Sequence, residues 1–160
     1  MPENWKSESW GSLISGESCP VCEQIHWNKK EDEHLIYICD LSFSRLHLAK
    51  NQFVKGYCVV ICRRHVIEPY ELSKEERASY FDDVAFAAKV LQSVFRADKM
   101  NYNILGNLIP HLHTHVLPRY FTDSAPNRPI DPGAAKVFLT PGQYEDRLRL
   151  ILDHIQLMRK

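Results

Sequence analysis

The hydrophobic positions in the first half of the chain follow the two-residue period of β-strands. Residues 34–40 are apolar and rich in strand-forming side chains, and residues 44–49 alternate polar with apolar side chains. Residues 56–62 form an almost continuous β-branched run, which is typical of a buried strand. Residues 51–55 separate the last two segments, so we expect the turn of a hairpin there.

The second half combines helical and strand-like segments. A capping box at Ser73 precedes apolar residues spaced three and four apart, which predicts one long amphipathic helix to about Ala97. Strands are expected at residues 102–105 and 112–117. A last helix begins at Thr140, where an N-cap residue is followed by proline. The long loop before that helix is marked by Pro126, Pro129, Pro132 and Gly133.

These elements fit one domain. Strands, a helix, strands and a final helix predict an α+β fold with an antiparallel sheet of about five strands, one long helix and a C-terminal helix. Residues 1–160 would divide into an irregular N-terminal segment at 1–33, a core of sheet and long helix at 34–120, and a loop with the C-terminal helix at 121–160. With 44% hydrophobic residues, a chain of 160 residues has enough apolar side chains for such a core.

Charge and cysteine content narrow the classes of function. Twenty basic and twenty acidic residues cancel, so no overall field attracts nucleic acid or an anionic membrane. No apolar stretch approaches the roughly 20 residues that a membrane span needs, and the first residues lack the pattern of a signal peptide. Five cysteines, two of them in a C-x-x-C pair, fit a reducing compartment. We therefore expect a cytoplasmic protein that binds neither nucleic acid nor membrane.

Three alternating histidines, His111, His113 and His115, form the most informative motif. On a strand every second side chain lies on one face, so the three imidazoles would share a face with the outer two about 13 Å apart. Neutral imidazole ligates metals, acts as a nucleophile and moves protons near pH 7. The structural alternative is two core histidines and one on the surface, but Thr, Lys or Glu more commonly fill solvent-facing strand positions. The run therefore indicates a chemical site.

Cys19 and Cys22 have the spacing of half a tetrahedral zinc site. The other ligands would be His65, just after the strand at 56–62, and one member of the histidine run. A redox motif and two unrelated buried cysteines are the alternatives. A redox motif would need a preceding strand, which the surrounding residues do not indicate. A metal held by these segments would anchor the N-terminal segment to the sheet.

The histidine run, followed by Pro118 and Arg119, is similar to the signature of the histidine triad family of nucleotide hydrolases and transferases. The order of motifs before it is also similar: a C-x-x-C pair, an apolar strand after Lys55 and Gly56, a histidine shortly after that strand, and a long helix. The resemblance covers roughly residues 19–119. It implies a homodimer that acts on a small nucleotide substrate.

The resemblance also implies a role for each histidine. In the family the middle histidine attacks the α-phosphorus of a nucleotide derivative, and water resolves the covalent nucleotidyl-histidine; that role falls on His113. The third histidine, here His115, supports the nucleophile and the phosphate. In zinc-containing members the first triad histidine joins the C-x-x-C pair and the histidine after the buried strand. The matching ligands of a structural Zn²⁺ are Cys19, Cys22, His65 and His111.

Further residues are candidates for substrate contacts. Asn107 and Leu108 stand where the family commonly has Gln followed by Ser or Thr, so an amide can still donate to a phosphate oxygen but the hydroxyl is missing. Asn51 is the candidate for a ribose contact, with a plain turn residue as the alternative. Arg119 either meets a distal phosphate or caps the strand.

Three functions are compatible with these motifs to different degrees. The leading hypothesis is a nucleotidyl hydrolase or transferase that cleaves at the α-phosphate of a dinucleoside polyphosphate or nucleoside phosphoramidate. The second is a zinc-stabilised nucleotide-binding or protein-interaction module without catalysis, which the missing hydroxyl at Leu108 keeps open. The third is a hydrolase whose histidine run holds a catalytic metal. A catalytic metal there would need carboxylate ligands beside the histidine run, and residues 101–120 contain no Asp or Glu.

Overall fold

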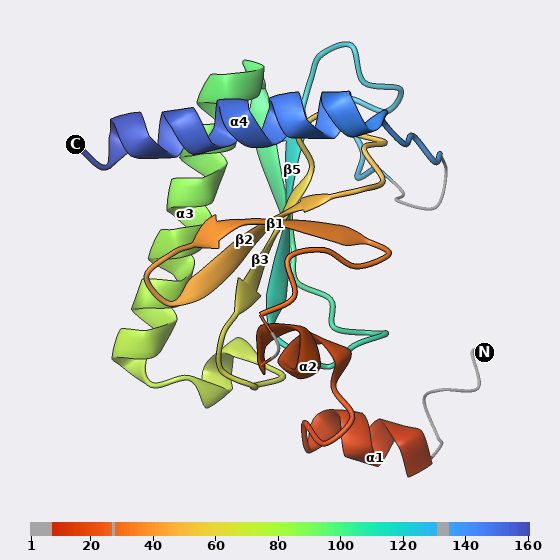
Figure 1. Ribbon diagram of the computed structural model, residues 1–160, viewed down its shortest axis with the longest axis vertical. Coiled ribbons are helices and arrows are strands. Elements are labelled where there is room, and N and C mark those ends of the chain that lie inside the picture. The colour runs from red at the N-terminus through yellow and green to blue at the C-terminus, as the bar shows by residue number, and fades with distance from the viewer. Residues whose placement is uncertain (1–7, 27, 131–134) are drawn as a thin grey trace.

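The computed structural model describes residues 8–26, 28–130 and 135–160 (Figure 1). Two residues expected to mark the long loop, Pro132 and Gly133, lie outside this part. The described elements, in chain order, are α1 Glu8–Ile14, α2 Pro20–His26, β1 Leu35–Asp40, β2 Ser44–Ala49, β3 Cys58–Cys62, the 3-10 helix η2 Pro69–Glu71, α3 Lys74–Phe95, β4 Lys99–Asn103, β5 His113–Arg119 and α4 Pro141–Met158. None of the helices in these residues is long and apolar enough to span a membrane.

The five strands form one antiparallel sheet in the order β1-β2-β3-β5-β4. The predicted α+β fold with an antiparallel sheet, a long helix and a C-terminal helix is therefore confirmed. The expected hairpin joins β2 to β3, in which Leu48 pairs with Cys58 and Ser44 pairs with Cys62. β1 and β4 are the two edges of the sheet.

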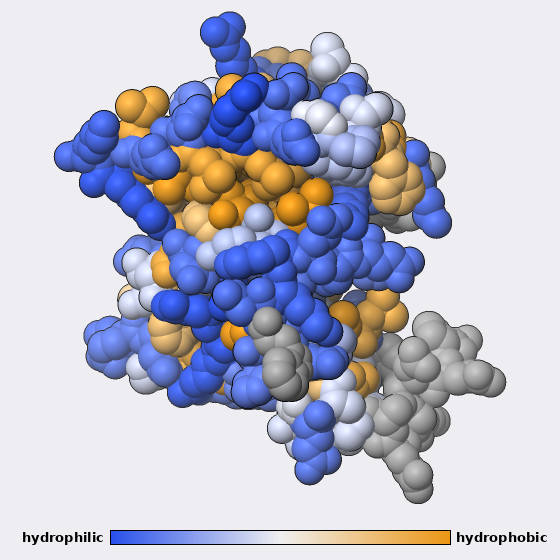
Figure 2. Space-filling model, in the orientation of Figure 1, coloured by the Kyte–Doolittle hydropathy of each residue, from blue (hydrophilic) through white to orange (hydrophobic). Residues whose placement is uncertain are grey.

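Helices α3 and α4 cover one face of the sheet and bury the larger core on it (Figure 1). Tyr80 and Leu91 of α3 and Ile151 of α4 pack there against Leu46 and Val60. Figure 2 shows apolar side chains gathered just below α4, where this layer meets the surface. Both predicted helix starts are confirmed, because each begins with a complete capping box.

The opposite face of the sheet holds a smaller apolar cluster and the histidines of β5. Val59 and Ile61 of β3 are buried there, and Val21 and Ile25 of α2 pack against this cluster. Side chains alternate between faces along a strand, so those of β5 that pair opposite Val59 and Ile61 lie on this same face. This face therefore carries the candidate chemistry, while the other face supplies most of the core.

The N-terminal segment differs from the irregular segment that was predicted. Within its described residues it contains α1 and α2, each seven residues long. Helices of this length are marginal alone and show too few turns for a periodic signal. Packing of Val21 and Ile25 on the sheet, with Pro20 at the first helical position, gives α2 its place in the fold.

The predicted bounds of the last two strands are also wrong. β4 ends at Asn103, and the next residues, Ile104 and Leu105, are exposed rather than paired, although their apolar side chains are typical of a strand. β5 begins at His113, because the amide of Leu112 instead donates to the carbonyl of Val66 (2.7 Å). The expected row of three imidazoles on one strand is therefore reduced to two, and His111 lies before the strand.

Candidate functional site

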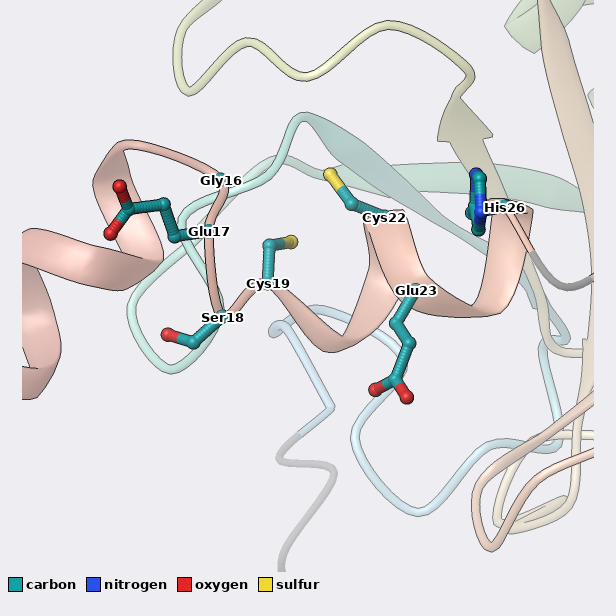
Figure 3. Close-up of a pocket in the computed structure, with 7 residues that line it drawn as sticks. All are labelled: Gly16, Glu17, Ser18, Cys19, Cys22, Glu23 and His26. Carbon is teal, nitrogen blue, oxygen red and sulfur yellow. The ribbon is translucent and has the colours of Figure 1, made fainter.

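Four metal-binding side chains converge from three segments. Cys19 and Cys22 come from the start of α2, His65 follows β3, and His111 precedes β5. Their ligand atoms all lie within 4.8 Å of one another. Figure 3 shows the two cysteines one turn apart at the start of α2, with the side chain of Glu23 pointing to the other side of the helix. These are the four residues that the sequence indicated as ligands.

Backbone carbonyls determine where the two imidazoles of this cluster carry their protons. Nε2 of His111 lies 2.7 Å from the carbonyl oxygen of Cys62, and Nε2 of His65 lies 2.8 Å from that of Ile14. A carbonyl oxygen can only accept, so each Nε2 is the donor and each Nδ1 of a neutral ring keeps its lone pair. Burial lowers the pKa of His111 to about 4, which keeps that ring neutral. Both Nδ1 lone pairs thus face the cysteines.

Three distances in the cluster match those around a tetrahedral zinc ion, while Sγ of Cys22 lies closer to Nδ1 of His65, at 3.2 Å. Zn–N bonds of about 2.05 Å and Zn–S bonds of about 2.3 Å separate two nitrogens by about 3.3 Å and a nitrogen from a sulfur by about 3.6 Å. The two Nδ1 atoms are 3.3 Å apart, and Nδ1 of His111 lies 3.6 and 3.5 Å from the sulfurs of Cys19 and Cys22. Two lone pairs at this distance repel unless a cation lies between them. Four protein ligands would leave no open position, as in structural zinc sites.

The alternative of a redox pair has less support. The C-x-x-C pair lies at the start of a helix, but that helix follows α1 rather than a strand. Burial, and then the neighbouring Cys19, raise the pKa of the Cys22 thiol to about 12. Redox cysteines need a lowered pKa, because the thiolate is the reactive species.

His113 and His115 form a second, adjacent pair on β5. Their rings are perpendicular, with centroids 4.8 Å apart. Nδ1 of His113 lies 2.6 Å from the carbonyl oxygen of His111, so it donates and Nε2 retains the lone pair. Burial lowers the pKa of His113, and burial followed by the proximity of His113 lowers that of His115 to about 4. Both rings are therefore neutral at pH 7.

The two clusters share one residue. The ring of His111 belongs to the cysteine–histidine cluster, while its carbonyl oxygen holds the ring of His113. Any displacement of the His111 backbone therefore reorients the lone pair on His113. A metal in the first cluster would hold this carbonyl in place and so help to fix the ring of His113.

The other predicted contact residues lie in loops. Asn107 is exposed in the loop between β4 and β5, beside Leu108, whose side chain is 71% exposed. Asn51 uses both ends of its amide on the segment before α4: its Oδ1 accepts from the amide of Val137 (2.9 Å), and its Nδ2 donates to the carbonyl of Ala135 (3.3 Å). The ribose contact predicted for Asn51 is untested by this arrangement.

Arg119 lies at the end of β5 with its side chain buried. Each guanidinium nitrogen has a partner: Nε pairs with Asp123 (2.7 Å), Nη1 donates to Asn101 and Nη2 donates to the carbonyl of Ala125 (2.7 Å). These contacts fit the strand-capping alternative, because they tie the loop after β5 to the sheet.

One residue at the site was not singled out from the sequence. Tyr57, just before β3, places its hydroxyl 2.6 Å from Nδ1 of His115. In the sequence, the available sign of Tyr57 was an aromatic residue at the start of a predicted strand. The register of β3 against β5 is needed to show which histidine it contacts.

Comparisons with known proteins agree with this geometry. The model of the HIT domain matches residues 28–122, more than half of the chain. An asymmetrical bis(5'-nucleosyl)-tetraphosphatase from Schizosaccharomyces pombe is 31% identical over 111 residues, which are 66% of this chain and 60% of that protein. The chain spans about half the length of the curated relatives it matches.

Solved structures show the same fold. A histidine triad protein from Bradyrhizobium japonicum superimposes with a TM-score of 0.71 at 24% identity, covering 77% of this chain and 92% of that one. A Zn-bound histidine triad family protein from Mycobacterium smegmatis gives 0.63 at 20% identity, covering 89% and 96%. With the family match over the sheet, the long helix and the paired histidines, the chain belongs to the HIT domain family.

Proposed function

We propose that this protein is a nucleotidyl hydrolase or transferase that cleaves at the α-phosphate of a dinucleoside polyphosphate or nucleoside phosphoramidate. The observation that carries the proposal is the state of His113: its Nδ1 proton is held by a carbonyl at 2.6 Å, which leaves Nε2 as a neutral nucleophile beside His115. The S. pombe relative, named for hydrolysis of a dinucleoside tetraphosphate, supports the substrate class.

The chemistry follows from that proton. Nε2 of His113 attacks the α-phosphorus, and the bond from phosphorus to the leaving oxygen or nitrogen breaks with its electron pair. A leaving nitrogen takes up a proton from solvent and departs as an amine. The ring becomes positive as the new P–N bond forms, and the carbonyl of His111 stabilises that charge through the Nδ1 proton. Water then attacks phosphorus, loses a proton to solvent, and the P–N electron pair returns to Nε2. In a transferase another hydroxyl or amine takes the place of water.

Turnover of a diadenosine polyphosphate and an adenosine phosphoramidate tests the proposal. His113→Asn should lower kcat by several orders of magnitude, each tenfold loss being about 1.4 kcal/mol of barrier, while nucleotide affinity and fold are kept. His115→Asn should lose roughly 10²- to 10⁴-fold, as supporting groups do. His34→Asn, an exposed histidine on the same chain, is the matched control and should keep full activity. A His113→Asn variant that retained more than a few per cent of turnover would exclude the covalent mechanism.

The same assay separates the leading function from the second one. A non-catalytic module would bind nucleotides with measurable affinity and turn over neither substrate. Quenching in alkaline denaturant during turnover adds a direct test, because the P–N bond of a nucleotidyl-histidine survives base and is cleaved by acid. A nucleotidyl group on His113 would then be found by mass spectrometry in the wild type and be missing from His113→Asn.

We also propose that the cluster of Cys19, Cys22, His65 and His111 holds one structural zinc. The 3.3 Å separation of the two Nδ1 lone pairs supports this, as does a zinc-bound structural neighbour. Bound there, zinc would cross-link α2 to the ends of β3 and β5. Metal analysis should find about one zinc per chain, lost in Cys22→Ala and kept in Cys39→Ala, which changes a cysteine outside the cluster. Equal zinc in both variants would exclude the site.

A second copy of the chain is the partner we propose. Among residues 8–26, 28–130 and 135–160 no strand pairs with the outer edge of β4. Beside this edge Phe81, Tyr102 and Ile104 expose 38–48% of their surface around an apolar groove. Pairing of two β4 edges would join the sheets and cover the groove. Light scattering of the wild type should give twice the mass of one chain. Ile104→Glu should reduce the measured mass to that of a single chain, whereas Leu157→Glu, on the exposed side of α4, should leave the dimer mass unchanged.

We propose the cytoplasm as the compartment of this protein. All five cysteines are free, and Cys58 and Cys62 are buried within β3. A reducing compartment would keep the thiols of the zinc cluster available for the metal. Mass spectrometry of protein alkylated in intact cells should find the five thiols unoxidised, and a native disulfide would contradict this placement.

A further inference from the structure

Tyr57, just before β3, is the diagonal neighbour of His115 on the adjacent strand β5. In the antiparallel pairing Val59 lies opposite His115, and Tyr57, two residues before Val59, has its side chain on the same face. Diagonal neighbours are within reach of an aromatic side chain. The hydroxyl oxygen lies 2.6 Å from Nδ1 of His115, and an edge-on contact with Phe53 holds the tyrosine ring, with centroids 5.2 Å apart. Tyr57 is only 9% exposed.

The direction of this hydrogen bond follows from what the hydroxyl can reach. Burial raises the pKa of Tyr57, so the oxygen keeps its proton. A buried O–H group needs an acceptor. Among residues 8–26, 28–130 and 135–160, Nδ1 of His115 is the hydrogen-bond partner found for this hydroxyl. The hydroxyl therefore donates to the Nδ1 lone pair, and the single proton of the neutral imidazole must lie on Nε2.

The two neighbouring histidines are thus held as opposite tautomers. In His113 a carbonyl acceptor at 2.6 Å places the proton on Nδ1 and the lone pair on Nε2. In His115 a hydroxyl donor at the same distance places the lone pair on Nδ1 and the proton on Nε2. The pair offers one nucleophilic nitrogen and one N–H donor, which is the combination that attack on a charged phosphate ester needs.

We infer that Tyr57 is a positioning residue that holds His115 as its Nε2–H tautomer, so that His115 donates a hydrogen bond to a phosphate oxygen of the substrate. This inference rests on the proposed function. In the other tautomer the Nε2 lone pair would face the phosphate oxygens and repel them. Because the substrate oxygen gains charge as His113 attacks, the N–H donor acts mainly on the transition state, and its loss affects kcat more than KM.

The first test reads the tautomer in the zinc-loaded protein without substrate. Long-range ¹⁵N–¹H correlation spectra at pH 7 should show His115 protonated on Nε2 and bare on Nδ1, with its signals identified by their loss in His115→Asn. In Tyr57→Phe, which keeps the ring and removes the hydroxyl, the Nδ1 shift should move toward the value of a protonated nitrogen. A wild-type His115 with its proton on Nδ1, or a Tyr57→Phe variant with unchanged shifts, would overturn the inference.

The second test is kinetic. Tyr57→Phe should lower kcat about tenfold with KM nearly unchanged, the loss expected for one net hydrogen bond. Tyr144→Phe is the matched control, because it removes a hydroxyl that donates to the carbonyl of Lys50 away from the histidines (2.6 Å), and it should leave kcat unchanged. Equal kcat in Tyr57→Phe and wild type would overturn the role. If the wild type turned over no nucleotide derivative, the proposed function would fail, and the nitrogen shifts would still decide whether Tyr57 sets the tautomer.

Discussion

Replacement of Asp83 should destabilise the protein strongly, because this buried carboxylate ties α3 to the connection between β1 and β2. Its Oδ2 accepts from the amides of Phe43 (2.7 Å) and Ser44 (2.9 Å) and from the hydroxyl of Ser44 (2.7 Å). Its Oδ1 accepts from the amide of Ser42 (3.0 Å). The side chain thus pairs four donors, three of them on the backbone of one turn.

The size of the effect follows from which donors water can reach. In Asp83→Ala the exposed Ser42 amide regains a water partner, and the half-buried Phe43 amide regains one in part. The Ser44 amide and hydroxyl are fully buried and stay unpaired, at roughly 1–3 kcal/mol each. Relief from burying a charge offsets part of this loss. We expect the free energy of unfolding to fall by about 3 kcal/mol, which lowers Tm by about 6–12 °C for a chain of this length.

Urea and thermal unfolding of the zinc-loaded protein measure this. Asp82→Ala is the matched control, since the neighbouring residue lies in the same helix turn with an exposed side chain, and it should change stability by less than about 0.5 kcal/mol. Asp83→Asn should fall between the two, because one amide oxygen can accept only two of the four bonds. If Asp83→Ala matched Asp82→Ala, the carboxylate would not hold the turn and this reasoning would be wrong.

Two further predictions concern the backbone before Tyr57 and a buried histidine. Gly56→Ala should lower the free energy of unfolding by roughly 2 kcal/mol or more, because φ is +85° and a Cβ would lie 2.4 Å from the ring of Phe95. In the control Gly142→Ala the new Cβ meets nothing within 4 Å, so its free energy of unfolding should change by less than about 0.5 kcal/mol in the same urea titration. Burial, and then the charge of Arg45, lower the pKa of His47 to about 4. Between pH 6.5 and 4 the imidazole of His47 therefore binds a proton in the unfolded chain but not in the folded one. As the pH is lowered through this range, the free energy of unfolding decreases by up to about 3 kcal/mol because of this residue. His47→Leu should remove that part of the fall between pH 7 and pH 4.5, and an equal pH dependence in both proteins would contradict it.

The sequence by itself determined the features that depend on neighbouring residues. The capping boxes at Ser73 and Thr140 act within one helical turn, so both long helices begin where they were predicted. The buried strand and its hairpin were visible because a two-residue period needs only a few residues to show. The fold class followed from the order of these elements. The four side chains that converge at the metal cluster were identifiable because few residue types ligate zinc and their motifs matched a known order.

Only the tertiary structure decided the features that depend on partners distant in sequence. α1 and α2 are too short to be stable alone, and contacts across the fold place α2. The exposed Ile104 and Leu105 have the same side chains as a strand interior, so the end of β4 could not be read from them. The proton positions on His113 and His115 depend on a carbonyl two residues away and a hydroxyl 58 residues away, respectively. A tautomer is set by the group opposite each nitrogen, and no local pattern of residues contains that information.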